Sequence, residues 1–214
     1  MILKFGTDPV GGWFYWDPRG RTSEREAFRW AVEALRPVTE VLKAHQLLSV
    51  DVTRVRTVAE PHAYQDRPAS SDHPVDDLLA VVGAPALGAT PLGARLEGTG
   101  VVVQPAGRVE VRDVVTAGLA ESGGVGTIFV ETRCDAWLPF NLRGMPQQEL
   151  YELNAPRLRA ALEEIERRLG VRGAGESTKF AQCEGYTLVN YFDVCEEPVD
   201  IAEFGYDDTW IASS

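Results

Sequence analysis

Residues 98–133, GTGVVVQPAGRVEVRDVVTAGLAESGGVGTIFVETR, decide the fold class. The valine-rich runs on either side of Pro105-Ala106-Gly107 predict a hairpin across that turn. Residues 114–121 fit either a strand or a helical turn. A strong strand is predicted from Thr127, with Ile128, Val130 and Thr132 on one face and Phe129, Glu131 and Arg133 on the other. Consecutive strands without intervening helices favour hairpin connections over a regular alternation of strand and helix.

The N-terminal part of the chain predicts a strand followed by a long helix. The aromatic block Trp13–Trp16 ends a run that is apolar on both faces, which is typical of a buried central strand. We therefore favour a core role for this block over stacking on a ligand. Ser23 and Glu26 form a capping-box pattern, and apolar spacing then predicts a helix over about 23–47. Pro37 should kink or split that helix, because proline lacks the backbone N–H.

The next part of the sequence predicts a strand, followed by a long stretch without hydrophobic periodicity. Residues 50–58, VDVTRVRTV, predict a half-exposed strand. The stretch EPHAYQDRPASSDHP, residues 60–74, has three prolines and no periodicity, so it is either a functional loop or a mobile one. A short helix is predicted over 75–82. We expect a single globular domain over residues 1–214, and any weak boundary would fall within 60–95.

The C-terminal half predicts two helices and a hairpin. A short helix is expected over 147–153, and a second over 155–169 with Asn154 as its N-cap, Pro156 in its first turn and Gly170 as its stop. The apolar stripe of the second helix consists of Leu158, Ala161, Leu162, Ile165 and Leu169. A final hairpin should turn near Glu184-Gly185.

The order of these elements predicts an α+β fold. We expect a mixed or mainly antiparallel sheet, with one amphipathic helix near the N-terminus and another at about 155–169.

Composition narrows the classes of partner. The net charge of −11 opposes binding to nucleic acid and to anionic membrane surfaces, and no basic patch is visible along the sequence. No apolar run approaches the roughly 18 to 20 residues that span a bilayer. The first residues lack the pattern of a signal peptide, and the three cysteines form no CxxC motif. We therefore expect a cytoplasmic protein with reduced thiols. The preference for arginine over lysine is typical of a high-GC bacterial genome.

No motif for a catalytic centre, a cofactor or a metal is found. The glycine-rich residues 121–127 precede a strand and contain no lysine, so they predict a turn and not a phosphate loop. His45, His62 and His73 have no metal-ligand spacing. The loop of residues 60–77 nevertheless offers a conceivable metal or acid/base site, formed by His62, His73, Asp66, Asp72, Asp76 and Asp77. The cysteines, Cys134, Cys183 and Cys195, fall on predicted strands, where buried, unreactive thiols are usual.

Charge is concentrated at the C-terminus. Residues 176–214 contain nine carboxylates and one lysine, so they carry a formal charge of −8. Aromatic residues are interleaved with these carboxylates, which is unusual for a disordered acidic tail. A solvated face and a metal site are alternatives, but the D-x-D-x-D-G pattern of calcium loops is absent. We interpret the acidic end as a docking surface for a basic protein, formed by Glu196, Glu197, Asp200, Glu203, Tyr206, Asp207, Asp208 and Trp210.

Two functions follow from these observations. The first is an immunity or antitoxin-type inhibitor that docks a basic toxin or enzyme through the acidic end, an analogy of charge and size. The alternative is a metal-assisted hydrolase or transferase that uses the 60–77 loop together with the C-terminal carboxylates.

Overall fold

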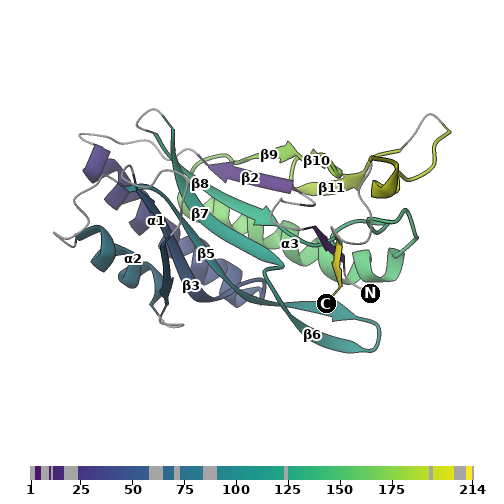
Figure 1. Ribbon diagram of the computed structural model, residues 1–214, viewed down its shortest axis with the longest axis horizontal. Helices are drawn as coiled ribbons and strands as arrows, with labels where there is room; N and C mark the ends of the chain where they lie inside the picture. Colours follow the sequence, from purple (N-terminus) through teal and green to yellow (C-terminus); the bar gives the residue numbers. More distant parts are fainter. Residues whose placement is uncertain are drawn as a thin grey trace.

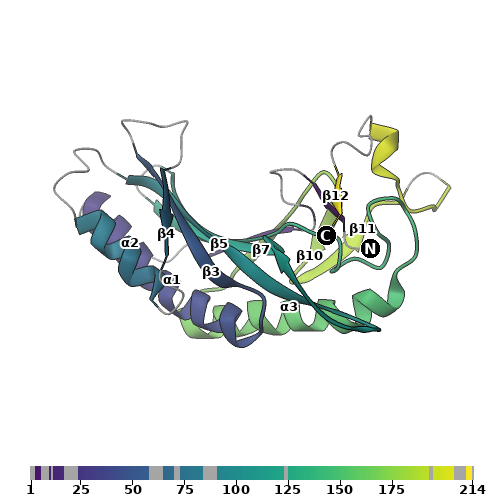
Figure 2. The same cartoon turned by 60° about the horizontal axis from the view of Figure 1, so that its bottom comes forward.

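The computed structural model describes residues 3–5, 10, 12–16, 24–57, 65–69, 73–83, 91–122, 125–192, 195–204 and 211–213. These residues form a large antiparallel sheet with helices on one face, so the fold is of the α+β class, as predicted (Figure 1). Figure 2 shows the helices together beneath the sheet. None of the helices that the structure describes has an apolar stretch long enough to cross a membrane.

The large sheet has eight strands. Their order is β4, β3, β5, β7, β8, β2, β9, and β6 pairs with the far end of β5. All pairings described within this sheet are antiparallel. The strands are β2 (Gly12–Trp16), β3 (Ser49–Thr57), β4 (Gln65–Pro68), β5 (Pro91–Gln104), β6 (Gly107–Arg112), β7 (Val115–Ser122), β8 (Val125–Thr132) and β9 (Ala174–Ser177).

Several local predictions for this sheet are confirmed. β5 and β6 form the hairpin across Pro105 and Ala106, with Gln104 paired to Gly107. The ambiguous residues 114–121 form most of β7, a central strand between β5 and β8. Within the glycine-rich residues 121–127, Glu121 pairs with Gly126 and Ser122 pairs with Val125, so the described residues of this stretch are the paired ends of β7 and β8.

The aromatic N-terminal strand is internal to the sheet, as predicted. β2 lies between β8 and β9, and Phe14 and Trp16 are completely buried. These two residues are therefore core residues. The side chain of Trp13 lies outside the described part of the chain.

Two small two-stranded sheets complete the strands of the structure. β1 (Leu3–Phe5) pairs with β12 (Ile211–Ser213), and β10 (Ala181–Glu184) pairs with β11 (Thr187–Asn190). The second pair confirms the predicted hairpin, since Gly185 adopts the left-handed conformation at its turn with φ 62°. A short 3₁₀ helix, η2 (Ile201–Phe204), follows.

The helices are α1 (Glu24–Ala44), α2 (Pro74–Gly83) and α3 (Gln148–Leu169). α1 is continuous through Pro37, so of the two predicted outcomes, a kink or a split, the split does not occur. Burial explains why the helix tolerates the proline, because Val38, Val41 and Leu42 directly after it are fully buried. The proposed capping box at the start of α1 lies outside the described residues.

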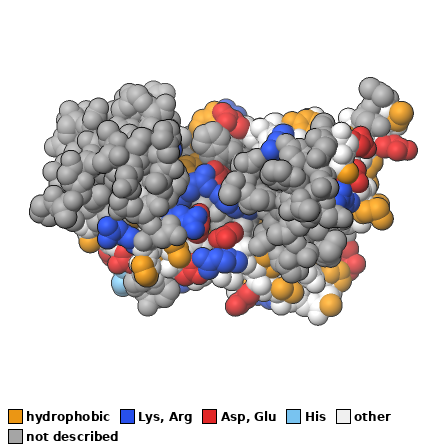
Figure 3. Space-filling model, in the orientation of Figure 1, with side chains coloured by type: hydrophobic (Ala, Val, Ile, Leu, Met, Phe, Trp, Pro, Cys, Tyr) orange, Lys and Arg blue, Asp and Glu red, His pale blue; other side chains and the backbone are white. Residues whose placement is uncertain are grey.

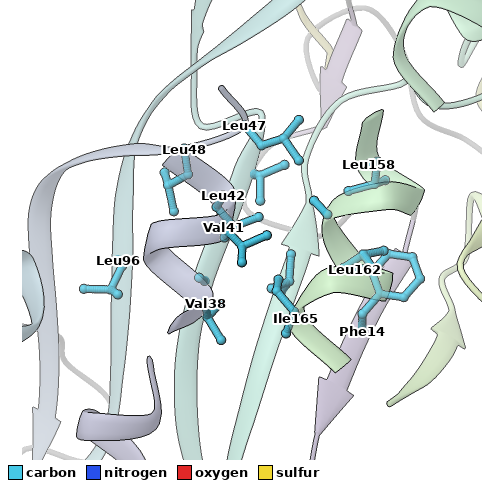
Figure 4. Packing of buried hydrophobic residues seen from close by; sticks show 14 of the residues in the cluster. Phe14, Val38, Val41, Leu42, Leu47, Leu48, Leu96, Leu158, Leu162 and Ile165 are labelled. Carbon is cyan, nitrogen blue, oxygen red and sulfur yellow. The ribbon is translucent and has the colours of Figure 1, made fainter. Parts of the chain in front are cut away.

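The main core lies between the helices and the sheet. Figure 4 shows Val38 and Val41 of α1 close to Ile165 of α3, with Leu162 beside Phe14 of β2. Leu158, Leu162 and Ile165 of the predicted stripe are at most 2% exposed. The stripe is therefore the face of α3 that packs into the core.

The prediction of two helices divided at Asn154 is wrong. α3 is a single helix that contains Pro156 in its interior and ends at Leu169. Gly170 is the stop that was predicted, and its φ of 66° makes it a left-handed C-cap. Asn154 is buried inside the helix, and its side chain contacts the backbone of Val103 in β5. The N-cap position is occupied by Gln147, which makes no side-chain capping bond.

Candidate functional site

The first of the predicted docking residues, Glu196 and Glu197, lie in a loop that is closed by backbone pairing between Phe192 and Pro198. Phe192 and Pro198 form an isolated antiparallel bridge, and the Val199 N–H donates to the Tyr191 carbonyl at 3.1 Å. Glu196 lies within this loop and has a left-handed backbone conformation with φ 63°. Glu196 and Glu197 are both exposed. The loop therefore presents two neighbouring carboxylates to solvent.

The carboxylate of Asp200 contacts other parts of the protein. Its carboxylate accepts a hydrogen bond from the Arg143 guanidinium at 3.2 Å and another from the Ala202 N–H at 2.8 Å. The backbones of Arg143 and Asp200 also form a bridge, so Asp200 joins the C-terminal segment to the loop of residues 134–147. Its charge is compensated within the protein, and we assign it a supporting role. Glu203, in η2, is exposed.

The remaining predicted docking residues, Tyr206, Asp207, Asp208 and Trp210, lie outside the described residues. The four described docking residues, Glu196, Glu197, Asp200 and Glu203, lie on the segment of residues 195–204.

An apolar patch lies beside the two exposed glutamates. Phe192, at the base of their loop, is 50% exposed and packs edge-on against Phe140, with 5.9 Å between the ring centroids. Met145 is 60% exposed, and its carbonyl accepts a hydrogen bond from the N–H of Asn141, the neighbour of Phe140. Sequence reasoning did not assign Phe140 to this surface, because its contact with Phe192 depends on the tertiary structure.

A small second core supports this end of the molecule. It consists of Val10, Leu142, Phe180 and Ile201, all at most 6% exposed. The Ile201 N–H donates to the Leu142 carbonyl at 3.0 Å, which again ties the C-terminal segment to the 134–147 loop. The exposed carboxylates and Phe192 are therefore presented on a packed support.

A second group of charges lies on the sheet face opposite the helices. Arg54 of β3 and Arg95 of β5 are direct cross-strand partners. Arg54 pairs with Glu97 at 3.2 Å, and Arg95 pairs with Glu131 of β8 at 2.9 Å. Arg133 also contacts Glu131, at 3.3 Å. Figure 3 looks onto this face and shows basic and acidic side chains side by side at its centre.

The sequence did not predict this group of arginines, because they are not clustered along the chain. The signal was present in β3, where Arg54 and Arg56 alternate with valine and so share one face. Their approach to Arg95 and Arg133 depends on strand order, which the sequence does not reveal. Among the described residues, Glu97 and Glu131 interleave with them, so the face is an ion-pair network.

The described part of the 60–77 loop does not assemble a metal site. His73 Nδ1 lies 3.8 Å from Asp76, but Asp76 is bonded to Arg36 at 2.6 Å, and this bond holds the pKa of the Asp76 carboxyl below its usual value. No group of three potential ligands occurs among the residues described. His62, Asp72 and the side chain of Asp66 lie outside them, so the metal hypothesis stays untested there.

The three cysteines differ in their environments. Cys134 is buried, as expected. Cys183 is partly buried in β10, and burial, together with the charge of Glu176, raises the pKa of its thiol to about 11. Cys195 is exposed, so the prediction of a buried thiol is wrong at this position. It lies in the turn of the acidic loop and not on a strand.

Comparisons of the chain with protein-family models, with curated proteins and with solved structures give no significant match. The function is therefore argued from the residues themselves.

Proposed function

We propose that this chain is a binding protein that docks a basic protein partner through its acidic end, as an inhibitor of the immunity or antitoxin type does. One observation carries the proposal: Glu196 and Glu197 are exposed in the loop whose base presents the half-exposed ring of Phe192. In protein interfaces, aromatic side chains supply much of the binding energy, and complementary charges orient the partner. This loop offers both at one place.

The rigidity of the support favours the same function. The loop is closed by the bridge between Phe192 and Pro198 and is followed by the Arg143–Asp200 ion pair. A surface that is already ordered loses less conformational entropy when a partner binds. Asp200 would therefore contribute indirectly, by holding the segment that carries Glu196 and Glu197.

The charge distribution favours a basic partner. Residues 176–214 contribute −8 to the net charge of −11, so a cationic protein is attracted to this end before contact. At about 0.15 M salt the screening length is roughly 8 Å, so charges close to the interface dominate the association rate.

The test uses charge-neutral variants of the same size. Glu196→Gln and Glu197→Gln are combined, and the matched control combines Glu110→Gln in β6 with Glu149→Gln in α3, both outside residues 176–214. Both control residues are exposed and make no ion pair among the described residues. The partner is captured from native lysate with the parent protein, and binding kinetics are then measured over a salt series.

We expect the acidic-loop variant to associate at least about tenfold more slowly at low salt, with a weaker salt dependence, while the control retains the parent rate. Phe192→Ala should act mainly on dissociation, because it removes an anchor and no charge. Equal association rates and equal salt slopes for the parent and the Glu196/Glu197 variant would show that the acidic end is only a solvated surface.

A further inference from the structure

A pocket of about 280 Å³ lies between α3 and β11. Three aromatic residues from different parts of the fold line it: Trp137 before α3, Tyr151 in α3 and Tyr186 before β11. On the helix side, the small residues Ala155 and Pro156 leave the space unfilled. The volume is slightly below the roughly 300–1,000 Å³ that is typical of ligand pockets. It suits one small molecule.

The aromatic residues offer their rings more than their polar atoms. Trp137 is completely buried, so the rings open to a ligand are those of Tyr151 and Tyr186, which are partly exposed. The Tyr186 hydroxyl already donates a hydrogen bond to Glu166 at 2.6 Å. Burial and this bond raise the pKa of Tyr186, so the side chain stays neutral at physiological pH. Neutral aromatic faces carry a negative electrostatic potential that attracts cations.

Negative charge at the pocket comes from Glu152. This exposed residue of α3 accepts a hydrogen bond from Gln148 at 2.7 Å and makes no ion pair among the described residues. Glu152 therefore brings a carboxylate to the wall of the pocket.

The one cation at the pocket is compensated. Arg159 lines the same pocket, but its guanidinium is bonded to Glu163 at 2.8 Å on the surface of α3. Glu163 cancels the charge of Arg159, and the charge of Glu152 remains. The pocket thus combines aromatic walls with a net negative charge.

We propose that this pocket binds a small alkylated ammonium ion, with its methyl groups against the rings of Tyr151 and Tyr186 and its charge near Glu152. Cavities lined by aromatic rings recognise quaternary ammonium groups in this way. An alkylated ammonium fits better than a primary one, because it sheds water more readily and fills more of an apolar pocket. None of the residues that line the pocket belongs to the proposed docking surface, so this proposal does not depend on the docking proposal.

The test compares choline with 3,3-dimethyl-1-butanol, which has the same shape and no charge. Each is titrated into the ¹⁵N-labelled full chain, and the backbone amide shifts of Tyr151, Glu152 and Leu188 are followed by NMR. We expect choline to bind at least about tenfold more tightly than the neutral alcohol, within the range of cation–π attraction in a partly desolvated site. Equal affinities would overturn the proposal, as would the absence of any shift with choline at about 50 mM, well above millimolar affinities.

Three variants locate the binding in the pocket. Tyr151→Leu removes one ring at a partly exposed position and should weaken choline binding about tenfold, whereas Tyr151→Phe keeps the ring and should retain it. Phe192→Leu removes an exposed ring outside the pocket and should leave choline affinity unchanged. If Tyr151→Leu binds choline as tightly as the parent, the proposed site is wrong. The unperturbed amide spectrum of each variant away from the pocket serves as the check on folding.

Discussion

Asn154 of α3 makes both backbone hydrogen bonds of Val103 in β5, as a neighbouring strand would. The Val103 N–H donates to Asn154 Oδ1 at 2.9 Å, and Asn154 Nδ2 donates to the Val103 carbonyl at 2.7 Å. Nδ2 also donates to the Leu150 carbonyl at 2.8 Å within the helix. One side chain therefore closes the edge of β5 beyond the point where its pairing with β3 ends.

Arg157 satisfies further backbone groups along the same edge of β5. Its guanidinium donates to the Val101 carbonyl at 3.0 Å and to the His45 carbonyl at 2.8 Å, and the Val101 N–H donates to the Gln46 carbonyl. Burial lowers the pKa of Arg157, although an arginine remains charged at physiological pH. The α1–β3 turn, β5 and α3 are thereby joined at one corner of the fold.

Replacing Asn154 by leucine should destabilise the protein by about 2 to 6 kcal/mol. The substitution keeps a side chain of similar size but leaves the N–H and carbonyl of Val103 without partners, and each buried unsatisfied group costs roughly 1–3 kcal/mol. Urea unfolding measures the loss. Gln148→Leu, on the exposed surface of the same helix, should change stability by less than about 0.5 kcal/mol. A similar small effect at Asn154 would mean that water replaces its hydrogen bonds.

Replacing Leu162 by alanine should cost about 2 to 5 kcal/mol, because Leu162 is fully buried where α3 meets the sheet. Leu153 of the same helix is 37% exposed, and Leu153→Ala is the matched control, with an expected loss below about 1 kcal/mol. Chemical denaturation of both variants tests the assignment of the core face. A loss below about 0.5 kcal/mol for Leu162→Ala would contradict it.

Local patterns predicted much of this fold because they act over a few residues. Valine-rich runs around a turn predicted the β5–β6 hairpin, and the stripe containing Leu162 predicted the buried face of α3. The same local reasoning failed at Asn154. Asparagine followed two residues later by proline is typical of a helix start, but contact with Val103, far away in sequence, places this asparagine in a helix interior.

The sequence predicted the residues of a candidate site only where a local concentration of charge marks them. The exposure of Glu196 and Glu197 follows from their sequence, but the pairing of Asp200 with Arg143 requires the contact between two distant loops. Likewise, the approach of Arg54 to Arg95 follows from strand register, and the aromatic pocket at Tyr151 follows from the packing of β11 on α3. Such long-range relationships have no signature in a single sequence.

Replacing Glu131 in the ion-pair network on the sheet should destabilise the protein. This carboxylate is 7% exposed and contacts both Arg95 and Arg133. Glu131→Gln removes the negative charge that compensates the largely buried guanidinium groups of Arg95 and Arg133. The substitution should therefore lower the free energy of unfolding by about 3 to 5 kcal/mol. Replacing Glu131 and Arg95 together by methionine should cost less than the sum of the single replacements. Thermodynamic double-mutant cycles measure this coupling, and additive losses would show that the two residues act independently.

The last prediction concerns pH and the contact of Tyr186 with Glu166. The Tyr186 hydroxyl donates to Glu166 at 2.6 Å, the Gly173 N–H donates to the same oxygen at 2.9 Å, and both bonds hold the pKa of Glu166 below its usual value of 4.5. A carboxyl whose pKa is lowered by folding stabilises the native state above the unfolded pKa. This contribution disappears as the pH falls through the folded pKa.

Tyr186→Phe removes the largest cause of this shift. The variant should therefore be less stable than the parent at pH 7, and the difference should shrink as the pH falls below about 4.5. Tyr191→Phe is the matched control, because the Tyr191 hydroxyl donates to the neutral carbonyl of Thr178 at 2.9 Å and its loss should cost the same at pH 3 and pH 7. The test compares the urea unfolding midpoints of the parent, Tyr186→Phe and Tyr191→Phe between pH 3 and pH 7. If the cost of Tyr186→Phe is independent of pH, the hydrogen bond does not favour the ionised form of Glu166.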